Sequence, residues 1–434
     1  MSCGKWEGKI TIPAGNWTAT LREFVPAAVV WTGATNFTAT GNDLLRTGAD
    51  GWDNNDAQGN DTIAGDGYVE AVLSAEAAIG LNDGAASGLS TIDFAFQRST
   101  NGSFKIVENG TPVYTSGNGE YTDGMVARVQ RIGGATAGAI TYWLDGVLKY
   151  TTAGTPVATL TVNAAAYTAG GTIDDAMVAD SGAGSTITLT ATKTYYHSSA
   201  GNDTVDLPAK LQALLDAASG ALNVAYTVTI DASEEGTGQY TISAIYDNGD
   251  GSANDPLEFT ITWVSTALRN ILGWTGNLAT GGGTSSYTSQ GSAEGLWLPD
   301  CAPLSLTSIG DEVEESDQSV LEAPTGTYVH RIVHHRKQVI TDLRYPQLTR
   351  RKARIVGETY ANESWQQFWR DVIDGDASAY LAMGQVRIYP DAGVDGTYYD
   401  YWVGAGLSEC RPTALREGWQ GVFGISISRL ILVE

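Results

Sequence analysis

The histidines near the C-terminal third are the residues whose types could bind a metal ion, and their surroundings argue against it. His330, His334 and His335 lie among arginines, whose positive charge would compete with a metal, and no cysteine or carboxylate stands at ligand spacing. We therefore expect no metal centre there. An alternating strand whose cations face an acidic partner fits the cluster better, and a contact to DNA is the second interpretation.

Three Gly-Asn-Asp triplets are the next candidates for chemistry, because Asp side chains and turn carbonyls can cage calcium in tandem repeats of such sequences. They begin at Gly41, Gly59 and Gly201 and are scattered, whereas the repeat mechanism needs several adjacent copies. The acidic stretch 247–251 lacks the ligand spacing and terminal Glu of an EF-hand loop. We expect surface turns and a polar hairpin tip at these positions, and no bound cofactor.

Catalytic motifs are absent from the sequence. It holds no nucleophile elbow, phosphate-binding loop, His-Glu-x-x-His pair or Ser/His/Asp pattern. Glycoside hydrolysis would need two carboxylates facing across a cleft, and 49 acidic residues include many pairs that no pattern distinguishes. The sequence therefore predicts a binding or structural protein and not an enzyme.

Aromatic side chains offer a different chemistry, since the CH faces of pyranose rings pack on aromatic rings. Half or more of such rings in a β-sandwich belong to the core, Trp143 especially, because it stands in mid-strand beside Leu144. Trp52 is the best exposed candidate, because it lies in the polar loop 50–55. The candidate glycan-binding residues are Trp52, Asp53, Asn54, Tyr114 and Tyr121.

Length and charge limit the classes of protein that must position these residues. A chain of 434 residues predicts two to four folding units. Its formal net charge of -24 disfavours nucleic acid or an anionic membrane as main partner. We expect a protein made and kept soluble in a cytoplasm, without a signal peptide or membrane insertion, because no apolar run is long enough. The cysteines are few and far apart, as expected of reduced thiols: Cys3, Cys301 and Cys410.

Residues 25–179 have the pattern of antiparallel strands joined by tight turns. Short alternating segments are broken by Gly, Asn and Asp, and no convincing helix interrupts them. The Asn109-Gly110 and Asp145-Gly146 pairs favour hairpin turns, which need positive φ. The clearest predicted strands are 68–73, 91–96, 104–107 and 140–144.

The same stretch resembles the concanavalin-like or laminin-G-like jelly-roll sandwiches. The resemblance is carried by IGL (79–81), TIDFAF (91–96), GSFKIVENG (102–110), DGMVARVQR (123–131) and ITYWLDGVLKY (140–150), in that order. It implies an antiparallel sandwich in which one hairpin has an Asn-Gly turn and a later one an Asp-Gly turn. It also implies either glycan binding, which is frequent among such domains, or a role as a spacer.

From residue 183 the pattern changes to a β-α-β-β-β-α module. The expected helix has one leucine face, a possible N-cap at Asp206, Pro208 in its first turn and Gly220 at its end. That face comprises Leu207, Leu211, Leu214 and Leu215. The expected strands are 186–191, 225–230, 239–245 and 257–263, followed by a short helix at 267–272 that Gly273 ends.

The end of this module resembles a segment of tail-associated proteins of tailed bacteriophages. The sequence LRNILGWTGNLATGGGTSSYTSQGSAEGLWLPD (268–300) has a Leu-Arg-x-x-Leu-Gly-aromatic-Thr-Gly helix end, a small-residue loop and an aromatic-Leu-Pro exit. The similarity covers residues 206–300. It implies a structural role in a virion and no particular chemistry.

The C-terminal section shows the sharpest segregation of charge. An acidic stretch at 311–317 is followed by a basic run, which we interpret as an assembly interface, with the acidic stretch of another copy as its possible partner. A helix at 364–373 and a final strand at 422–432 are also expected; such a strand suits a sheet completed by the chain's own tail or by a neighbouring subunit. The basic residues are Arg331, Arg336, Lys337, Arg344, Arg350, Arg351, Lys352 and Arg354.

These observations predict a mainly β protein with an α+β part. An antiparallel jelly-roll sandwich (25–182) is joined to the β-α-β-β-β-α module (183–302) and a C-terminal β-rich assembly domain (303–434). The strands expected at 9–13 and 17–21 precede the sandwich, so if residues 1–24 pair with the later body, the sandwich is an insertion.

The expected function is that of a bacteriophage virion component, in tail or baseplate, made in the host cytoplasm. Its expected partners are copies of itself, other virion proteins and host-surface polysaccharide bound by the sandwich. The alternatives are a stand-alone carbohydrate-binding protein and, third, a capsid decoration protein.

Overall fold

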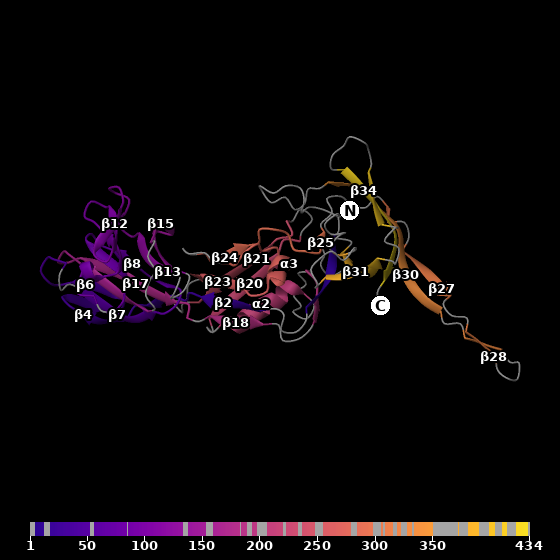
Figure 1. Cartoon of the computed structure of the whole chain (residues 1–434), viewed down its shortest axis with the longest axis horizontal. Coiled ribbons are helices and arrows are strands. Elements are labelled where there is room, and N and C mark those ends of the chain that lie inside the picture. Colours follow the sequence, from indigo (N-terminus) through magenta and orange to yellow (C-terminus); the bar gives the residue numbers. More distant parts are fainter. Residues whose placement is uncertain are drawn as a thin grey trace.

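The chain folds mainly into antiparallel β-sheet, as the computed structural model shows (Figure 1). Along its long axis, the sandwich lies at one end, a mixed α/β module in the middle and a further set of strands at the other end. The residues that the structure describes are 5–12, 18–52, 56–84, 86–132, 138–152, 159–182, 184–188, 193–197, 206–219, 223–232, 237–247, 255–278, 284–297, 305–306, 309–315, 319–322, 328–331, 334–349, 372, 381–389, 399–403, 410–414 and 422–432.

Two antiparallel sheets make up the sandwich, which confirms the predicted fold class. The first sheet has the order β12 (Thr111–Thr115), β11 (Phe104–Glu108), β10 (Phe94–Arg98), β9 (Ala77–Asn82), β16 (Leu160–Ala166), β7 (Asp56–Ile63) and β4 (Trp31–Ala34). The second has the order β15 (Val147–Thr151), β14 (Ala139–Leu144), β13 (Val126–Ile132), β8 (Gly67–Leu73), β17 (Thr172–Asp180), β6 (Asp43–Arg46) and β5 (Phe37–Thr40), and β3 (Ala27–Ala28) also pairs with β17.

The alternating residues of both sheets face inward and form one core. Ile79, Phe96, Val129 and Tyr142 are examples of residues with no exposed surface in this cluster. The two predicted hairpin turns are confirmed: Asn109 and Asp145 have φ of 49°, and the glycine after each also has positive φ. The strand expected at 91–96 begins only at Phe94, because a short 3₁₀ turn, η1 (Leu89–Thr91), precedes it.

The module contains the two predicted helices, α2 (Leu207–Ala218) and α3 (Thr266–Ile271), packed with its strands, and it adds short strands that the sequence did not predict at Lys193–Tyr195, Asp255–Pro256 and Ser286–Thr288. Asp206 holds the N-cap position of α2, although its side chain makes no capping hydrogen bond. At α3, Ser265 caps the first turn, and Gly273 follows the helix with φ of 79°. The strands are β18 (Ser185–Thr188), β20 (Val224–Ile230), β21 (Tyr240–Tyr246), β22 (Asp255–Pro256), β23 (Phe259–Trp263) and β24 (Ser286–Thr288).

The N-terminal strands pair with segments that follow the sandwich in sequence. Strand β2 (Thr18–Glu23) lies between β18 and β23, and Leu21 is the register partner of both Ser185 and Ile261. Strand β1 (Lys5–Ile12) pairs with β19 (Lys193–Tyr195), β25 (Leu296–Trp297) and β31 (Leu381–Tyr389). The chain therefore enters and leaves the sandwich at two neighbouring strands.

At the far end, the acidic and basic stretches pair with each other within one chain. Strand β27 (Ile309–Glu315) is antiparallel to β30 (His334–Thr349), with Glu312 opposite Lys337. The predicted last strand is β34 (Val422–Leu432), which pairs with β30, β32 (Tyr399–Val403) and β33 (Cys410–Ala414) of its own chain. The remaining short strands are β26 (Ser305–Leu306), β28 (Ser319–Glu322) and β29 (Tyr328–Arg331), and the helix expected at 364–373 lies almost wholly outside the described residues.

Candidate functional site

The best candidate for a binding site is an aromatic pair on the outer face of the first sheet. Trp52 follows β6, and Tyr167 follows β16; both rings are half-buried, with centroids 5.7 Å apart and an interplanar angle of 54°. The amide of Gly51 donates a hydrogen bond to the carbonyl of Tyr167 at 2.9 Å. This backbone bond holds the two loops, and hence the two rings, side by side.

The aromatic pair rests on small residues of the sheet. Trp52 packs against a cluster that includes Ala78 of β9 and Ala165 of β16, on the face opposite to the main core. The same cluster contains Leu89 and Ile92 of the segment after β9. The sheet thus covers part of the indole and leaves the rest accessible.

Carboxylates line this site. An Asp50 carboxylate oxygen accepts a hydrogen bond from the amide of Ala169 at 2.9 Å, and a Glu76 oxygen accepts one from the Thr168 hydroxyl at 2.6 Å. The amide of Tyr167 donates to the carbonyl of Glu76 at 2.9 Å. We call Trp52, Tyr167, Asp50, Asp56 and Glu76 the Trp52 face.

Asp56 joins the Trp52 face through strand register. It is opposite Ala165, which in turn is opposite Ala78, so the three side chains share the outer face of the first sheet. Partial burial raises the pKa of the Asp56 carboxyl above its ordinary value. The described residues show no cation within ion-pair distance of it.

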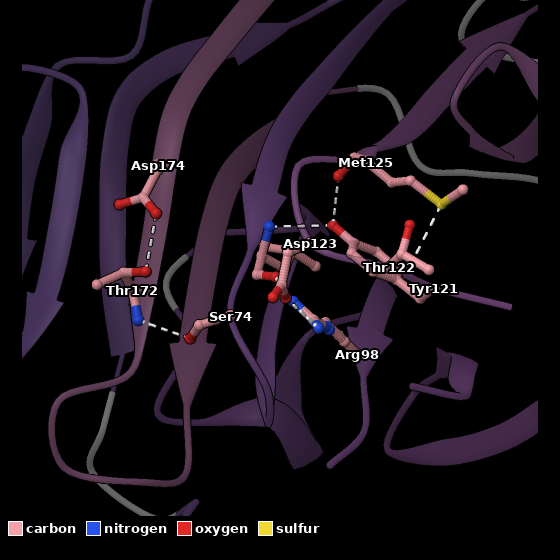
Figure 2. A network of polar contacts seen from close by, with 9 residues as sticks. Ser74, Arg98, Tyr121, Thr122, Asp123, Met125, Thr172 and Asp174 are labelled. Atoms are coloured by element: carbon pink, nitrogen blue, oxygen red, sulfur yellow. Dashed lines mark hydrogen bonds and ion pairs between the residues drawn. The ribbon is translucent and has the colours of Figure 1, made fainter. Parts of the chain in front are cut away.

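A polar network orders the neighbouring turns at this end of the sandwich (Figure 2). Ser74 accepts a hydrogen bond from the Thr172 amide at 2.7 Å, and the Thr172 hydroxyl donates to Asp174 at 2.8 Å. Arg98 donates to Asp123 at 2.5 Å and to the Leu73 carbonyl at 2.7 Å. These bonds fix the turn between β8 and β9, which also carries Glu76.

Tyr121 belongs to this network, and the prediction that it binds glycans is wrong. Only 1% of its surface is exposed. Its hydroxyl accepts from the Leu73 amide at 3.0 Å and donates to the Met125 carbonyl at 2.6 Å, while its ring packs in the core (Figure 2). Burial raises the pKa of Tyr121 to about 12. No sugar can reach the face of this ring.

The other predicted glycan-binding residues do not gather at one place. Tyr114 is half-buried at the open edge of the sandwich, where it stacks on Phe104 with centroids 5.7 Å apart and lies 6.0 Å from Tyr150. It is therefore not part of the Trp52 face. Asp53 and Asn54 lie outside the described residues.

Of the predicted assembly residues, four lie in described strands. Arg331 ends β29, and β30 contains Arg336, Lys337 and Arg344. The pairing of β27 with β30 gives the basic strand an acidic partner in its own chain, whereas the sequence suggested another copy. The two strands belong to the same chain and pair through their backbones, so the acidic strand of the same chain already occupies the position beside β30. Arg350, Arg351, Lys352 and Arg354 lie outside the described residues.

Sequence reasoning missed Tyr167, Glu76 and Asp56. The available signal was the turn-forming sequence Thr168-Ala169-Gly170-Gly171, which follows Tyr167 and ends the strand before it. Nothing in the sequence links Tyr167 to Trp52, because 114 intervening residues separate them.

Within the described residues, no group of three or more His, Cys, Asp or Glu side chains is arranged to hold a metal ion, and no helix has the length and apolarity to cross a membrane.

No protein-family model and no curated protein matches this chain. Among solved structures, the chain is similar to a stonustoxin structure, with 11% identity over 35% of this chain and 26% of that chain, at a TM-score of 0.27. It is also similar to lectin I-B4 from Griffonia simplicifolia, with 13% identity over 35% and 92% and a TM-score of 0.25. A third is carbohydrate-binding module CBM66 from Bacillus subtilis, with 10% identity over 39% and 94% and a TM-score of 0.21.

Proposed function

We propose that this chain is a structural component of a bacteriophage virion, in tail or baseplate, and that its sandwich binds host-surface glycans at the Trp52 face. The observation that carries the glycan part is the half-buried Trp52–Tyr167 pair, held on a rigid sheet by backbone hydrogen bonds. No bond-breaking step is included.

Sugar binding at this face would use two kinds of contact. The apolar CH face of a pyranose packs on the exposed part of the Trp52 and Tyr167 rings. Asp50 and Glu76 are already held by hydrogen bonds and have further acceptor lone pairs for sugar hydroxyls. Such a shallow site binds one sugar weakly, and repeated copies of the chain on a particle would raise the overall affinity.

The structural role is supported by the residues outside the sandwich. The segment 206–300 resembles tail-associated phage proteins, and it belongs to the module whose sheet takes up the N-terminal strand β2. The large net negative charge suits a protein that stays apart at high copy number until assembly. Partners would then be other copies of the chain and other virion proteins.

Solution mass and location on a particle separate the alternatives. A stand-alone carbohydrate-binding protein would remain a monomer at high concentration, whereas a tail or baseplate component would form a closed oligomer or bind a purified particle fraction. A capsid decoration protein would bind capsids instead of tails. A monomer that binds no particle component would contradict the virion proposal.

Glycan binding is tested by truncating the aromatic pair. We expect Trp52→Ala to weaken binding to a glycan array about tenfold, the equivalent of about 1.4 kcal/mol, because the sugar loses its main stacking surface. Trp143→Ala is the matched control. The sequence suggested that Trp143 is a core residue, but it is a half-buried indole on the second sheet, because its neighbours Tyr142 and Leu144 are the ones that face the core. Equal binding by wild type and Trp52→Ala would contradict the proposal.

A further inference from the structure

The sandwich is strongly acidic, and its few cations are already engaged. Residues 25–182 contain 17 Asp and Glu against six Lys and Arg. Arg98, Arg128 and Lys149 form ion pairs with carboxylates, while the side chains of Arg46 and Arg131 are buried. Lys105 is the sixth cation of the sandwich. Of the carboxylates at the Trp52 face, Asp50 has the buried Arg46 guanidinium as an electrostatic partner, and the sandwich as a whole is negative.

Lys105 lies far from Asp56 on the outer face of the first sheet. Successive register partners form one row across it, from Asp56 through Ala165, Ala78 and Gln97 to Lys105. Four strand spacings of roughly 4.8 Å separate the ends of this row, which gives about 19 Å. The ammonium group of Lys105 thus cannot serve as the counter-ion of the Asp56 carboxylate.

Asp56 is consequently a carboxylate that is partly removed from water and has no cation within ion-pair distance among the described residues. Burial without a counter-ion is costly, and it raises the pKa of this carboxyl. A cation brought by a ligand would reverse both effects. The position of Asp56, on the same face as the small residues under Trp52, puts this carboxylate within the proposed binding face.

We propose that the Trp52 face selects glycans that carry protonated amino groups, of the glucosamine type, over neutral and anionic glycans. The aromatic pair takes the CH face of the pyranose, and Asp56 receives the ammonium group, with Asp50 as a second, exposed carboxylate. This inference rests on the proposed glycan binding. The negative charge of the whole sandwich acts in the same direction, because it attracts a polycation and repels uronic acids.

The test compares three hexasaccharides of similar size by calorimetry: glucosamine, N-acetylglucosamine and galacturonic acid oligomers. We expect the glucosamine hexamer to bind about tenfold more tightly than its N-acetylated counterpart, and the galacturonate hexamer to bind more weakly than either. The advantage of the charged ligand should shrink as salt is raised, since screening weakens exposed charge pairs.

Asp56→Asn isolates the carboxylate with little change of shape. It should reduce the glucosamine preference to about twofold or less and leave N-acetylglucosamine binding unchanged. Asp145→Asn is the matched control, because it removes one negative charge at a hairpin turn of the second sheet, where Asn suits the positive φ. This control should keep the full preference.

Two results would overturn the inference, and they differ from failure of the proposed function. Equal binding of the charged and N-acetylated hexamers, or a full preference in Asp56→Asn, removes the amino-sugar selectivity while glycan binding stands. Loss of the preference in Asp145→Asn as well would show that general charge attraction, and not Asp56, produces it. Binding of no hexamer, or binding that Trp52→Ala leaves intact, rejects the Trp52 face itself.

Discussion

His197 is a fully buried histidine whose surroundings keep it neutral. Its Nε2 atom lies 2.8 Å from the Glu294 carbonyl, which can only accept, so Nε2 carries the proton. Nδ1, 2.7 Å from the Tyr240 hydroxyl, then accepts the tyrosine proton. Burial lowers the pKa of His197 most, the hydrogen bond to the Glu294 carbonyl opposes this, and Lys5 adds to the lowering, so that the pKa is about 4.

Because His197 is buried in its neutral form, we predict that the protein loses stability in mild acid. The unfolded chain binds a proton at His197 below about pH 6.5, whereas the folded chain resists it down to about pH 4. The free energy of unfolding should therefore decrease as the pH drops through that window, and at pH 5 it should be about 2 kcal/mol lower than at pH 7. Denaturant unfolding at pH 7 and pH 5 measures the loss. In His197→Gln the loss should shrink by a similar amount, and an unchanged loss would contradict the assignment.

At the residue scale, the sequence indicated which side chains could bind a sugar, but it did not show which of them are buried or which lie close together. It suggested that Trp52 is exposed because the surrounding residues are polar, whereas the ring is half-buried against the small residues of the first sheet. It placed Tyr121 on the surface, since nothing in the local pattern shows that the chain returns to the Leu73 amide. Asp56 and Tyr167 escaped notice because their proximity to Trp52 depends on the pairing of β7 with β16 and on the loops between sheets.

Arg128 links the sandwich to the module through an ion pair. Strand β13 presents it on the outer face of the second sheet, where it pairs with Glu70 of β8 at 2.7 Å and with Glu258, just before β23. The guanidinium also lies 3.9 Å from the ring centroid of Tyr68. Only 14% of the Arg128 side chain and 10% of the Glu258 side chain are exposed, so water screens this pair weakly.

Breaking this link should loosen the sandwich without unfolding it. In Glu258→Gln, Arg128 keeps Glu70 as its partner, while the change removes the charge pair between sandwich and module. We expect small-angle scattering to show a broader distribution of particle dimensions, with little change in the melting of the sandwich. Glu70→Gln, which alters a contact within the sandwich, is the control. Superimposable scattering curves for Glu258→Gln and wild type would contradict this account.

At the element scale, the sequence predicted the features that depend on neighbouring residues in the chain. The hairpin turns with Asn-Gly and Asp-Gly, the helix α2 with its leucine face and the helix end at Gly273 all follow from neighbouring residues. Pairings between distant strands, such as β1 with β31, depend on the whole chain and left no local signal. The same holds for β27 with β30, where opposite charge suggested a partner but not which copy supplied it.

The whole molecule contains a sandwich that takes the place of a hairpin loop. Leu21 of β2 and Ser185 of β18 are antiparallel register partners, although the entire sandwich lies between them in sequence. The sandwich core and the module core are separate clusters of buried residues. Across the junction, the ring of Phe24 stacks on Tyr68 with centroids 6.5 Å apart, while the Phe24 amide is held on the module side by a 3.0 Å hydrogen bond to the Glu258 carbonyl.

This topology predicts that both parts fold when they are separated. Replacing residues 27–180 by a short Gly-Ser linker should leave the module folded, because β2 and β18 need only a tight connection. The variant should also carry Phe24→Ser, because the deletion removes Tyr68 and would leave the Phe24 ring exposed to water. Residues 25–182 alone should melt cooperatively and retain glycan binding, because their core is complete. A module that fails to fold after the deletion, as judged by circular dichroism and by protection of the α2 amides from exchange, would show that the sandwich is instead an integral part of one cooperative unit.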